Sequence, residues 1–375
     1  MISDALNCKL STPMLYRKYR PQTFPQIVGQ NHVVQTLLGA LKTGRIGHAY
    51  LFTGSRGTGK TTLARILAKA LNCADFGKVG GDFIEKPNIP CNKCESCLAV
   101  NNGTSLDLIE IDAASQTGVD NIRELTDSAM VSAPGGKYKI FLIDEAHMLS
   151  KSAFNALLKI LEEPPAHVIF ILATTEPHKI LPTVLSRVQR FDFKRLTPQE
   201  ILSKLKAISK AEKIQITDDA LLAVARSADG ALRDAEVALT KIRNIAAQGS
   251  VGEAEILGIL GLIPSSYHPK FLEFLASGDK ASAIGLIHEI HDAGLDLDHF
   301  AKDFIAYTRS VLLSNVNPAL SAAMYGPGIH AQLTAFKTLD DVKIIKIINA
   351  FTTARSQIKF SPIPQLPLEL AVLQL

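Results

Sequence analysis

Short apolar runs alternate with helical patterns from about residue 30 to about residue 195. The apolar runs predict five strands, at residues 49–53, 106–111, 139–143, 168–173 and 191–193. The patterns between them predict helices at residues 61–71, 119–131 and 151–161. Because apolar runs bounded by helices are typical of a parallel sheet covered on both faces, this region predicts an α/β domain.

The pattern changes at about residue 196, where the strands cease and helical periodicity continues. Thr197 and Glu200 form a capping box, with Pro198 at the first helical position. Helices are predicted at residues 198–212, 218–228, 231–247, 298–314 and 340–358. Residues 248–250, with Gly252 after them, suggest a hinge, and the first thirty residues suggest an extended arm. The pattern therefore predicts three domains, at residues 1–195, 196–248 and 249–375.

Composition adds few restrictions to this picture. The chain has 375 residues, 47% of them hydrophobic, which is enough for two or three domains with real cores. A formal net charge of +4 fits an ordinary soluble protein and a protein that touches nucleic acid equally well. No apolar run approaches the roughly 18 residues that span a bilayer, and residues 1–20 lack the apolar core of a signal peptide. We therefore expect a cytoplasmic protein without a membrane partner.

A glycine-rich segment follows the first predicted strand and opens the next predicted helix. It matches the pattern G-x-x-x-x-G-K-[ST] and consists of Gly54, Ser55, Arg56, Gly57, Thr58, Gly59, Lys60 and Thr61, with Thr62 after it. Such a loop turns backbone N–H groups toward phosphate oxygens at a helix N-terminus. Lys60 would reach the β- and γ-phosphates of ATP, and Thr61 would bind Mg²⁺. A glycine-rich turn without a ligand is the alternative, which the strand–loop–helix context disfavours.

Two acidic residues, Asp144 and Glu145, come directly after the predicted strand at residues 139–143. Because the carboxyl ends of parallel strands form the usual ligand site of an α/β sheet, we expect this pair to face the glycine-rich loop. Asp144 would organise Mg²⁺, and Glu145 would be the general base that activates water. A pair of solvated acids is the alternative, and the loop upstream makes it less attractive.

Four of the five cysteines lie close together in the sequence, at Cys73, Cys91, Cys94 and Cys97. In a reducing compartment such a group favours a metal over disulfides. Four thiolates can complete a closed tetrahedral zinc site, which is structural rather than catalytic. An iron–sulfur cluster also uses closely spaced cysteine triplets, and four free buried cysteines are a further alternative.

Further short segments extend these motifs into one pattern. Asp144 and Glu145 continue as D-E-A-H through His147. Other segments read YRKYRP at residues 16–21, VGQ at 28–30, GRIGHAYLF at 44–52, IEIDAAS at 109–115, FNALLK at 154–159, LEEPP at 161–165 and LATT at 172–175. Over about residues 15–240 the chain resembles the gamma/tau subunit family of the bacterial DNA polymerase III clamp loader, a branch of the AAA+ ATPases.

The resemblance implies an α/β P-loop (AAA+) domain, a small helical lid domain and an all-helical collar domain. It also implies a zinc insert at about residues 72–100, which decides between zinc and an iron–sulfur cluster at the four cysteines. Thr174 or Thr175 would sense the γ-phosphate of ATP. Arg187, after Ser186, would be an arginine finger that reaches the ATP of a neighbouring subunit.

Two details of the resemblance concern the arginines. Val188 stands where the family usually has cysteine, which affects local packing more than the role of Arg187. Arg233, within GALRD at residues 230–234, would contact the nucleotide from the lid. Val28 and the arm at residues 17–20 would line the adenine pocket. A solvated surface side chain is the alternative for each of the two arginines.

The implied function is that of an ATP-driven motor that loads the sliding clamp onto primed DNA during chromosome replication. The reaction would be hydrolysis of ATP to ADP and phosphate, with no polymerase active site in the chain. The implied cofactors are ATP, Mg²⁺ and Zn²⁺. The implied partners are the delta and delta-prime subunits, copies of this chain, and the polymerase core if a C-terminal tail exists. Two alternatives stay open: another AAA+ motor of the branch-migration helicase type, and a non-hydrolysing clamp-loader subunit.

Overall fold

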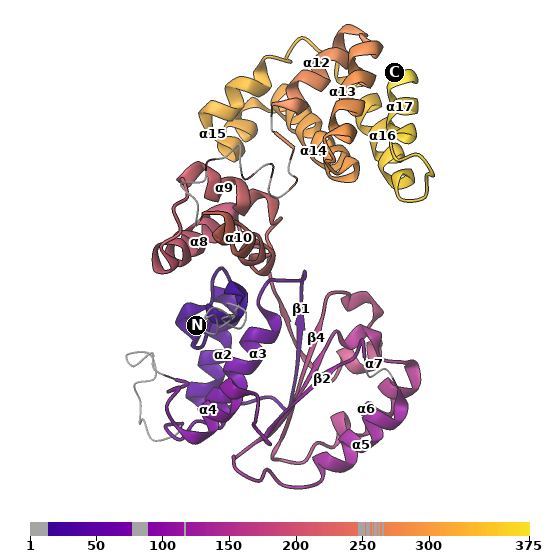
Figure 1. Cartoon of the computed structure of the whole chain (residues 1–375). Helices are drawn as coiled ribbons and strands as arrows, with labels where there is room; N and C mark the ends of the chain where they lie inside the picture. Colours follow the sequence, from indigo (N-terminus) through magenta and orange to yellow (C-terminus); the bar gives the residue numbers. More distant parts are fainter. Residues whose placement is uncertain are drawn as a thin grey trace, which may run out of the picture. The chain divides into compact units, whose positions relative to one another are not determined.

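The computed structural model describes residues 14–76, 89–115, 118–246 and 266–375, with isolated positions between 252 and 264. It divides into two compact units, Met1–Val251 and Gly252–Leu375, which Figure 1 shows in sequence colours. Each unit has a hydrophobic core of its own. The predicted hinge at residues 248–250 and the beginning of the predicted arm lie outside the described residues.

The first unit is built on a five-stranded parallel sheet with the strand order β2-β3-β4-β1-β5. The strands are β1 (Ala49–Thr53), β2 (Leu108–Asp112), β3 (Lys139–Asp144), β4 (Val168–Thr174) and β5 (Gln189–Asp192). The register pairs Thr53 with Thr174 and Asp112 with Asp144, so polar residues gather where the strands end. All five predicted strands are present, and the predicted α/β fold is confirmed.

Helices cover both faces of this sheet (Figure 1). On one face lie α2 (Asn31–Thr43) and α3 (Lys60–Leu71). On the other face lie α5 (Val119–Ala129), α6 (Lys151–Glu162) and α7 (Pro182–Leu185). Because both faces are covered, β1, β3 and β4 are buried along their length apart from the last residue of β3. That last residue, Asp144, is partly exposed and can therefore reach a ligand.

Three helices of the first unit follow the sheet: α8 (Pro198–Glu212), α9 (Asp218–Ser227) and α10 (Leu232–Ala246). α8 begins with the predicted capping box. The hydroxyl of Thr197 accepts a hydrogen bond from the N–H of Glu200, and the carboxylate of Glu200 accepts one from the N–H of Thr197. The predicted boundary at residue 195 lies inside one compact unit and stays a prediction.

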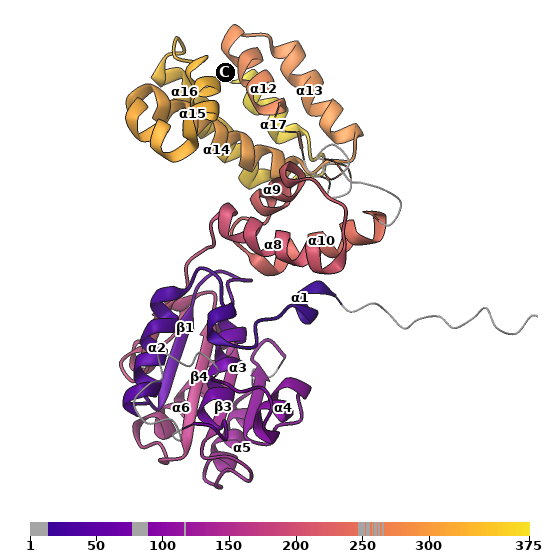
Figure 2. The ribbon, with the colours of Figure 1, turned by 90° about the vertical axis from the view of Figure 1, so that its left-hand side faces the viewer.

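The segment before α2 is not the extended arm that the sequence suggests. It contains two short helices, α1 (Leu15–Lys18) and η1 (Phe24–Gln26). Leu15 is fully buried, and its N–H donates a hydrogen bond to the hydroxyl of Thr240 in α10, at 3.2 Å. Figure 2 shows α1 beside α10. The expectation of an extended conformation is wrong for these two short helices, and contacts with a distant helix stabilise the first of them.

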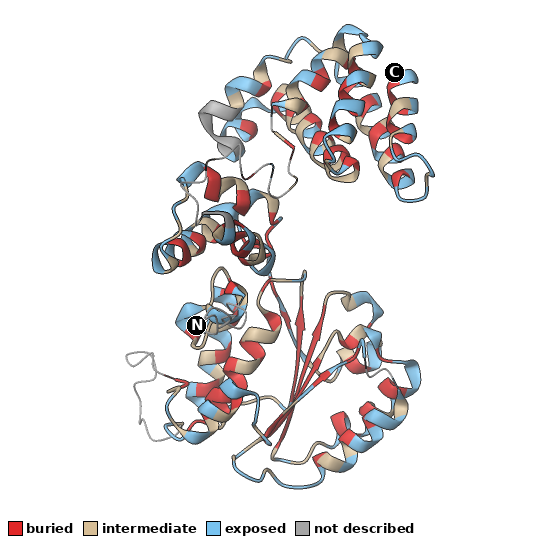
Figure 3. Ribbon diagram, viewed as in Figure 1, coloured by how far each residue is buried: buried red, intermediate tan, exposed pale blue. Residues whose placement is uncertain are grey.

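All regular elements in the described part of the second unit are helices, as predicted. Its helices are α12 (Tyr267–Ser277), α13 (Lys280–Asp292), α14 (Leu297–Val316), α15 (Pro318–Thr334), α16 (Asp341–Ile358) and α17 (Leu366–Leu373). The ring of Phe271 lies 4.8 Å from the ring of Phe304 and 5.1 Å from the ring of Phe300, between centroids. Figure 3 shows buried positions along the strands of the first unit and on these helices. No helix in the described part of the chain is long and apolar enough to cross a membrane.

Candidate active site and metal centre

The loop between β1 and α3 has a backbone that demands glycine. Gly54, Gly57 and Gly59 have φ angles of 145°, 79° and 102°, in the region that side chains disfavour. A Cβ atom on Gly54 would lie 2.6 Å from the carbonyl oxygen of Phe193, and one on Gly57 would lie 2.9 Å from the Cβ of Ala231. Neighbouring segments therefore leave no room for a side chain at Gly54 or Gly57, whereas at Gly59 the space is open and the backbone conformation alone favours glycine.

Lys60 and Thr61 begin α3 and face the loop and the end of β3. The ammonium group of Lys60 donates hydrogen bonds to the carbonyl oxygens of Gly54 and Ser55, at 2.8 and 2.9 Å. Burial lowers the pKa of Lys60, and the nearby acids counteract part of that shift. The hydroxyl of Thr61 donates to the Oδ2 atom of Asp144 at 2.8 Å. The two predicted motifs thus meet at one point.

Glu145 begins the short helix η2 (Ala146–Met148) with a φ angle of 47°. Its carboxylate accepts a hydrogen bond from the hydroxyl of Thr175 at 3.1 Å. The Nδ1 atom of His147 lies 3.4 Å from the same carboxylate oxygen. These contacts fix the position of the Glu145 carboxyl group, while the backbone N–H of Glu145 donates a hydrogen bond to the Oδ1 atom of Asp144 at 3.0 Å.

The two threonines at the end of β4 have different surroundings. Thr174 is fully buried, and its hydroxyl bonds to the Nδ1 atom of His147 and to the N–H of Glu176, both at 3.0 Å. The hydroxyl of Thr175 instead reaches Glu145. Of the two candidates for sensing a phosphate, Thr175 is the one in contact with the acidic pair. The contribution of His147 has no signal in the sequence beyond its place in D-E-A-H.

A cavity of about 1040 Å³ opens beside the glycine-rich loop. Its walls come from the loop, the carboxyl edge of the sheet, the segment before α2, and α10. The predicted site residues that line it are Arg56, Gly57, Thr58, Gly59, Lys60, Thr61, Thr62, Asp144, Glu145 and Arg233. Val28, Arg17 and Arg20 line it as well. A cavity of this size suits a nucleotide, and segments far apart in the sequence form it.

Several cationic side chains line the cavity. The guanidinium group of Arg233 stacks over the ring of Tyr16, 4.9 Å from its centroid. Arg20 donates a hydrogen bond from Nε to the hydroxyl of Thr62 at 3.1 Å. Burial, together with Arg65 and Arg233, lowers the pKa of Arg20 to about 10. The cavity therefore concentrates positive charge and favours an anion.

Arg187 lies elsewhere on the first unit, after α7, and the described lining of the cavity does not include it. Its guanidinium group donates to the carbonyl oxygen of Thr183 at 2.6 Å and forms an ion pair with Glu162 at 2.7 Å. Val188, the next residue, packs against the core on the α6 side of the sheet. The structure thus places Arg187 near the surface, where it does not join the other predicted residues of its own chain.

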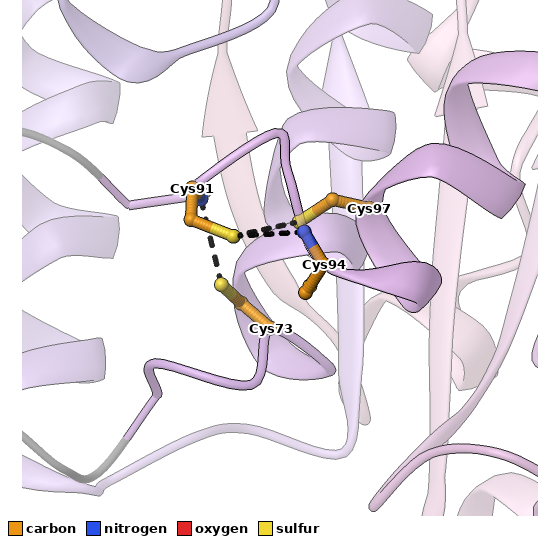
Figure 4. A group of neighbouring side chains, drawn as sticks. All are labelled: Cys73, Cys91, Cys94 and Cys97. Carbon is orange, nitrogen blue, oxygen red and sulfur yellow. Dashed lines mark hydrogen bonds between the residues drawn. The ribbon is translucent and has the colours of Figure 1, made fainter.

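The four clustered cysteines form a compact group of sulfur atoms beside α4 (Glu95–Asn102), which Figure 4 shows. All four are free thiols, and their sulfur atoms lie within 4.8 Å of one another. Zn–S bonds of about 2.3 Å in a tetrahedron separate sulfurs by about 3.8 Å, so the group fits one Zn²⁺ ion. A multi-iron cluster would hold its sulfur ligands farther apart.

Backbone N–H groups point at the same sulfurs. The N–H of Cys91 donates to the Sγ of Cys73, and the N–H of Cys94 donates to the Sγ of Cys91, both at 3.4 Å. Burial raises the pKa of Cys73. Burial acts in the same direction on Cys94, but hydrogen bonds from the backbone of Ala74 and Cys97 and from nearby thiols lower its pKa to about 7. Such N–H···S contacts stabilise the thiolate form that a metal requires.

Comparison with known proteins finds two matching family models. The model described as "DNA polymerase III, delta subunit" matches residues 29–197. The model described as "DNA polymerase III subunits gamma and tau domain III" matches residues 251–375. One model therefore covers the sheet and its helices, and the other covers the second unit.

Curated relatives carry related names. DNA polymerase III subunit tau of Bacillus subtilis is 39% identical over 371 residues, which are 98% of this chain and 63% of the relative. Subunit gamma/tau of Mycobacterium tuberculosis is 43% identical over 82% of this chain and 52% of the relative. This chain thus spans roughly half to two thirds of their length. Among solved structures, the RuvB branch migration motor of Thermotoga maritima matches with a TM-score of 0.47 and 18% identity, over 68% of this chain and 79% of that one.

Proposed function

Because this chain belongs to the gamma/tau family of bacterial DNA polymerase III subunits, we propose that it is an ATP-hydrolysing motor subunit of a clamp loader. It would load the sliding clamp onto primed DNA during replication in the cytoplasm. The observation that carries the proposal is the contact between Thr61 and Asp144 in the cavity that Lys60 lines. This contact unites a phosphate-binding loop with a pair of carboxylates.

Each residue of the cavity would have a defined task. The backbone from Gly54 to Thr62 would surround the phosphates, and the ammonium group of Lys60 would exchange its carbonyl partners for β- and γ-phosphate oxygens. Thr61 and Asp144 would hold Mg²⁺, which when bound neutralises charge on those oxygens. Glu145 would accept a proton from the attacking water. The products would be ADP and phosphate.

The remaining contacts to the nucleotide would come from other segments. Thr175 would position Glu145 and approach the γ-phosphate, with Thr174 supporting it from the buried side. Arg233 would contribute its charge from α10. Arg187 would exchange Glu162 for the γ-phosphate of ATP bound to a neighbouring subunit. Hydrolysis would then depend on assembly with copies of this chain and with the delta and delta-prime subunits.

The four cysteines would hold a structural Zn²⁺ ion. Cys73 follows α3, and Cys91, Cys94 and Cys97 belong to the next described segment. The ion would therefore fix the connection after the helix that begins with Lys60. The second unit would supply the collar through which subunits associate.

The test is ATP turnover by the protein assembled with its partner subunits, clamp and primed DNA. We expect Lys60→Ala to lower turnover by about 100-fold or more, because the phosphate charge loses its main cationic partner. Lys206→Ala is a matched control, since Lys206 is an exposed lysine whose ion pair is with Asp218 on a neighbouring helix. Equal turnover in the wild type and in Lys60→Ala would rule out the proposed motor activity.

A further inference from the structure

The cavity contains an acidic residue that none of the motifs explains. Glu236 lies on α10, three residues after Arg233, and both residues line the cavity. Residues three apart share one side of a helix, so Glu236 faces the same space as Arg233. Only 5% of Glu236 is exposed. A carboxyl group is therefore enclosed in the wall of the candidate nucleotide site.

Within the described residues, one oxygen of this carboxyl group lacks a hydrogen-bond partner. Its Oε1 atom is buried and makes no hydrogen bond within the described residues. Burial raises the pKa of Glu236 to about 7, and only Lys204 acts against this shift. A buried polar atom without a partner costs free energy, and native structures rarely retain one without a reason. Such a group is suited to bind something that enters the cavity.

The surroundings of Glu236 indicate what would enter. The cavity that Glu236 lines is also lined by Ile27, Val28 and Leu232, which are apolar, and by Tyr16, over whose ring Arg233 lies. A nucleotide whose phosphates lie on the glycine-rich loop must extend its base toward another wall of this cavity. Apolar side chains combined with a few well-placed polar groups are typical of sites that hold and orient an organic ligand.

We propose that Glu236 reads the base of the nucleotide by accepting a hydrogen bond from the 6-amino group of adenine. The inference rests on the proposed binding of ATP and adds a determinant of base specificity to it. When ionised, the carboxyl group of Glu236 can only accept a hydrogen bond, and above about pH 7 the ionised form predominates. Adenine carries a donor at position 6, whereas guanine carries a carbonyl oxygen there, which would meet Glu236 with repulsion.

The experiment compares two nucleotides that differ in this one group. Equilibrium binding with Mg²⁺ is measured for ATP and for purine riboside 5′-triphosphate, which is ATP without the 6-amino group. We expect the wild type to bind ATP about tenfold more tightly or better. Glu236→Leu should bind the two nucleotides alike, because the acceptor is gone. Glu236→Gln, whose amide keeps a carbonyl oxygen, should retain part of the preference.

Asp234→Asn is the matched control, since Asp234 is an exposed acid on the same helix. This variant should prefer ATP over purine riboside 5′-triphosphate as strongly as the wild type does. Equal binding of both nucleotides by the wild type would overturn the inference without any variant. A preference that survives in Glu236→Leu, or tighter binding of GTP than of ATP by the wild type, would overturn it as well. Failure of the wild type to bind ATP at all would instead overturn the proposed function, and the inference with it.

Discussion

Adjacent residues of the same type can serve different parts of a site, as Thr174 and Thr175 show. β4 ends at Thr174, and Thr175 lies in the bend that follows it. The hydroxyl of Thr174 consequently lies in the interior with His147 and the N–H of Glu176, while that of Thr175 lies with Glu145. The sequence L-A-T-T contains no information that separates the two, because the distinction depends on where the strand ends.

Replacing each threonine by valine should separate the two roles. Thr175→Val should lower ATP turnover by about tenfold or more with little change in stability, because Glu145 loses the hydrogen bond that positions it. Thr174→Val should lower the free energy of unfolding by about 1–3 kcal/mol, because two buried groups lose their partner. Steady-state hydrolysis and urea unfolding of both variants give the comparison. If both variants lost turnover and stability to the same extent, the two threonines would not have separate roles.

Glu236 should make stability depend on pH in the absence of nucleotide. Its pKa is raised from 4.5 to about 7 in the folded chain, so between these values the folded state binds more protons than the unfolded state. The contribution of Glu236 to stability should therefore be most favourable below about pH 4.5 and should be lost as pH rises through 7. Glu236→Gln lacks this dependence. Relative to the wild type, it should gain on the order of 2–3 kcal/mol of stability between pH 4.5 and pH 8.

Urea unfolding of the two proteins at several pH values measures that difference. Asp234→Asn should follow the wild type, since the exposed carboxyl group on the same helix has no comparable burial. A constant difference between Glu236→Gln and the wild type across the range would show that the carboxyl group is solvated in the folded protein.

At the scale of elements, α3 connects the glycine-rich loop to the cysteine site. Lys69, near the end of α3, is 1% exposed, and its ammonium group makes hydrogen bonds to four oxygens, so at least one of its three N–H groups is shared between two of them. Two go to Gln22, at 3.0 Å to its carbonyl oxygen and 2.6 Å to Oε1. The others go to the side-chain oxygens of Asn92 and Asn101, both at 2.8 Å. One buried cation thus joins α3, the segment before α2, the cysteine loop and α4.

Removing that cation should weaken both the fold and the metal site. Burial lowers the pKa of Lys69 to about 8, so the group is still charged at neutral pH. Lys69→Met keeps the aliphatic chain and leaves buried oxygens unpaired. We expect it to lose about 2–4 kcal/mol of unfolding free energy and to release zinc faster to a chromophoric chelator. Lys42→Met, at an exposed position of α2, is the control. Equal unfolding free energies and equal rates of zinc release in the two variants would show that Lys69 does not link α3 to the cysteine site.

Elements with local signals could be predicted from the sequence, and elements held by distant contacts could not. α8 begins and ends where the capping box and the periodicity place it. α2 was missed although Val33, Leu37 and Leu41 recur at helical spacing and are buried. α1 has no such signal, because its anchor is Thr240. The same division holds for the site: the loop and the acidic pair are visible as motifs, whereas Glu236 and Lys69 depend on tertiary packing.

At the scale of the whole molecule, Arg187 raises the question of assembly. Its ion pair with Glu162 involves side chains that are 33% and 52% exposed, so the pair contributes little stability and can exchange partners. The described lining of the chain's own cavity does not include Arg187. If Arg187 takes part in hydrolysis, a second subunit must therefore present it. A single chain cannot display such an arrangement, in its sequence or in its structure.

Arg187→Ala should leave ATP affinity of the isolated subunit unchanged, because its own cavity keeps every lining residue. Turnover by the assembled complex should fall by about 1,000-fold, the usual effect of removing an arginine that acts from a neighbour. Arg190→Ala is the matched control: Arg190 is similarly exposed, and its ion pair with Asp192 stays within β5. Loss of ATP affinity in the isolated Arg187→Ala subunit would show that the arginine acts within its own chain.

Mixing two inactive variants distinguishes the two arrangements directly. Arg187→Ala retains an intact cavity, and Lys60→Ala retains an intact arginine. In complexes assembled from both, some interfaces join the cavity of the first variant to the Arg187 of the second, and these interfaces have every group that the wild type has. Turnover should therefore return in the mixture, measured against complexes of each variant alone. An arginine that served its own cavity could not be supplied by another subunit, so a mixture as inactive as its components would exclude action between subunits.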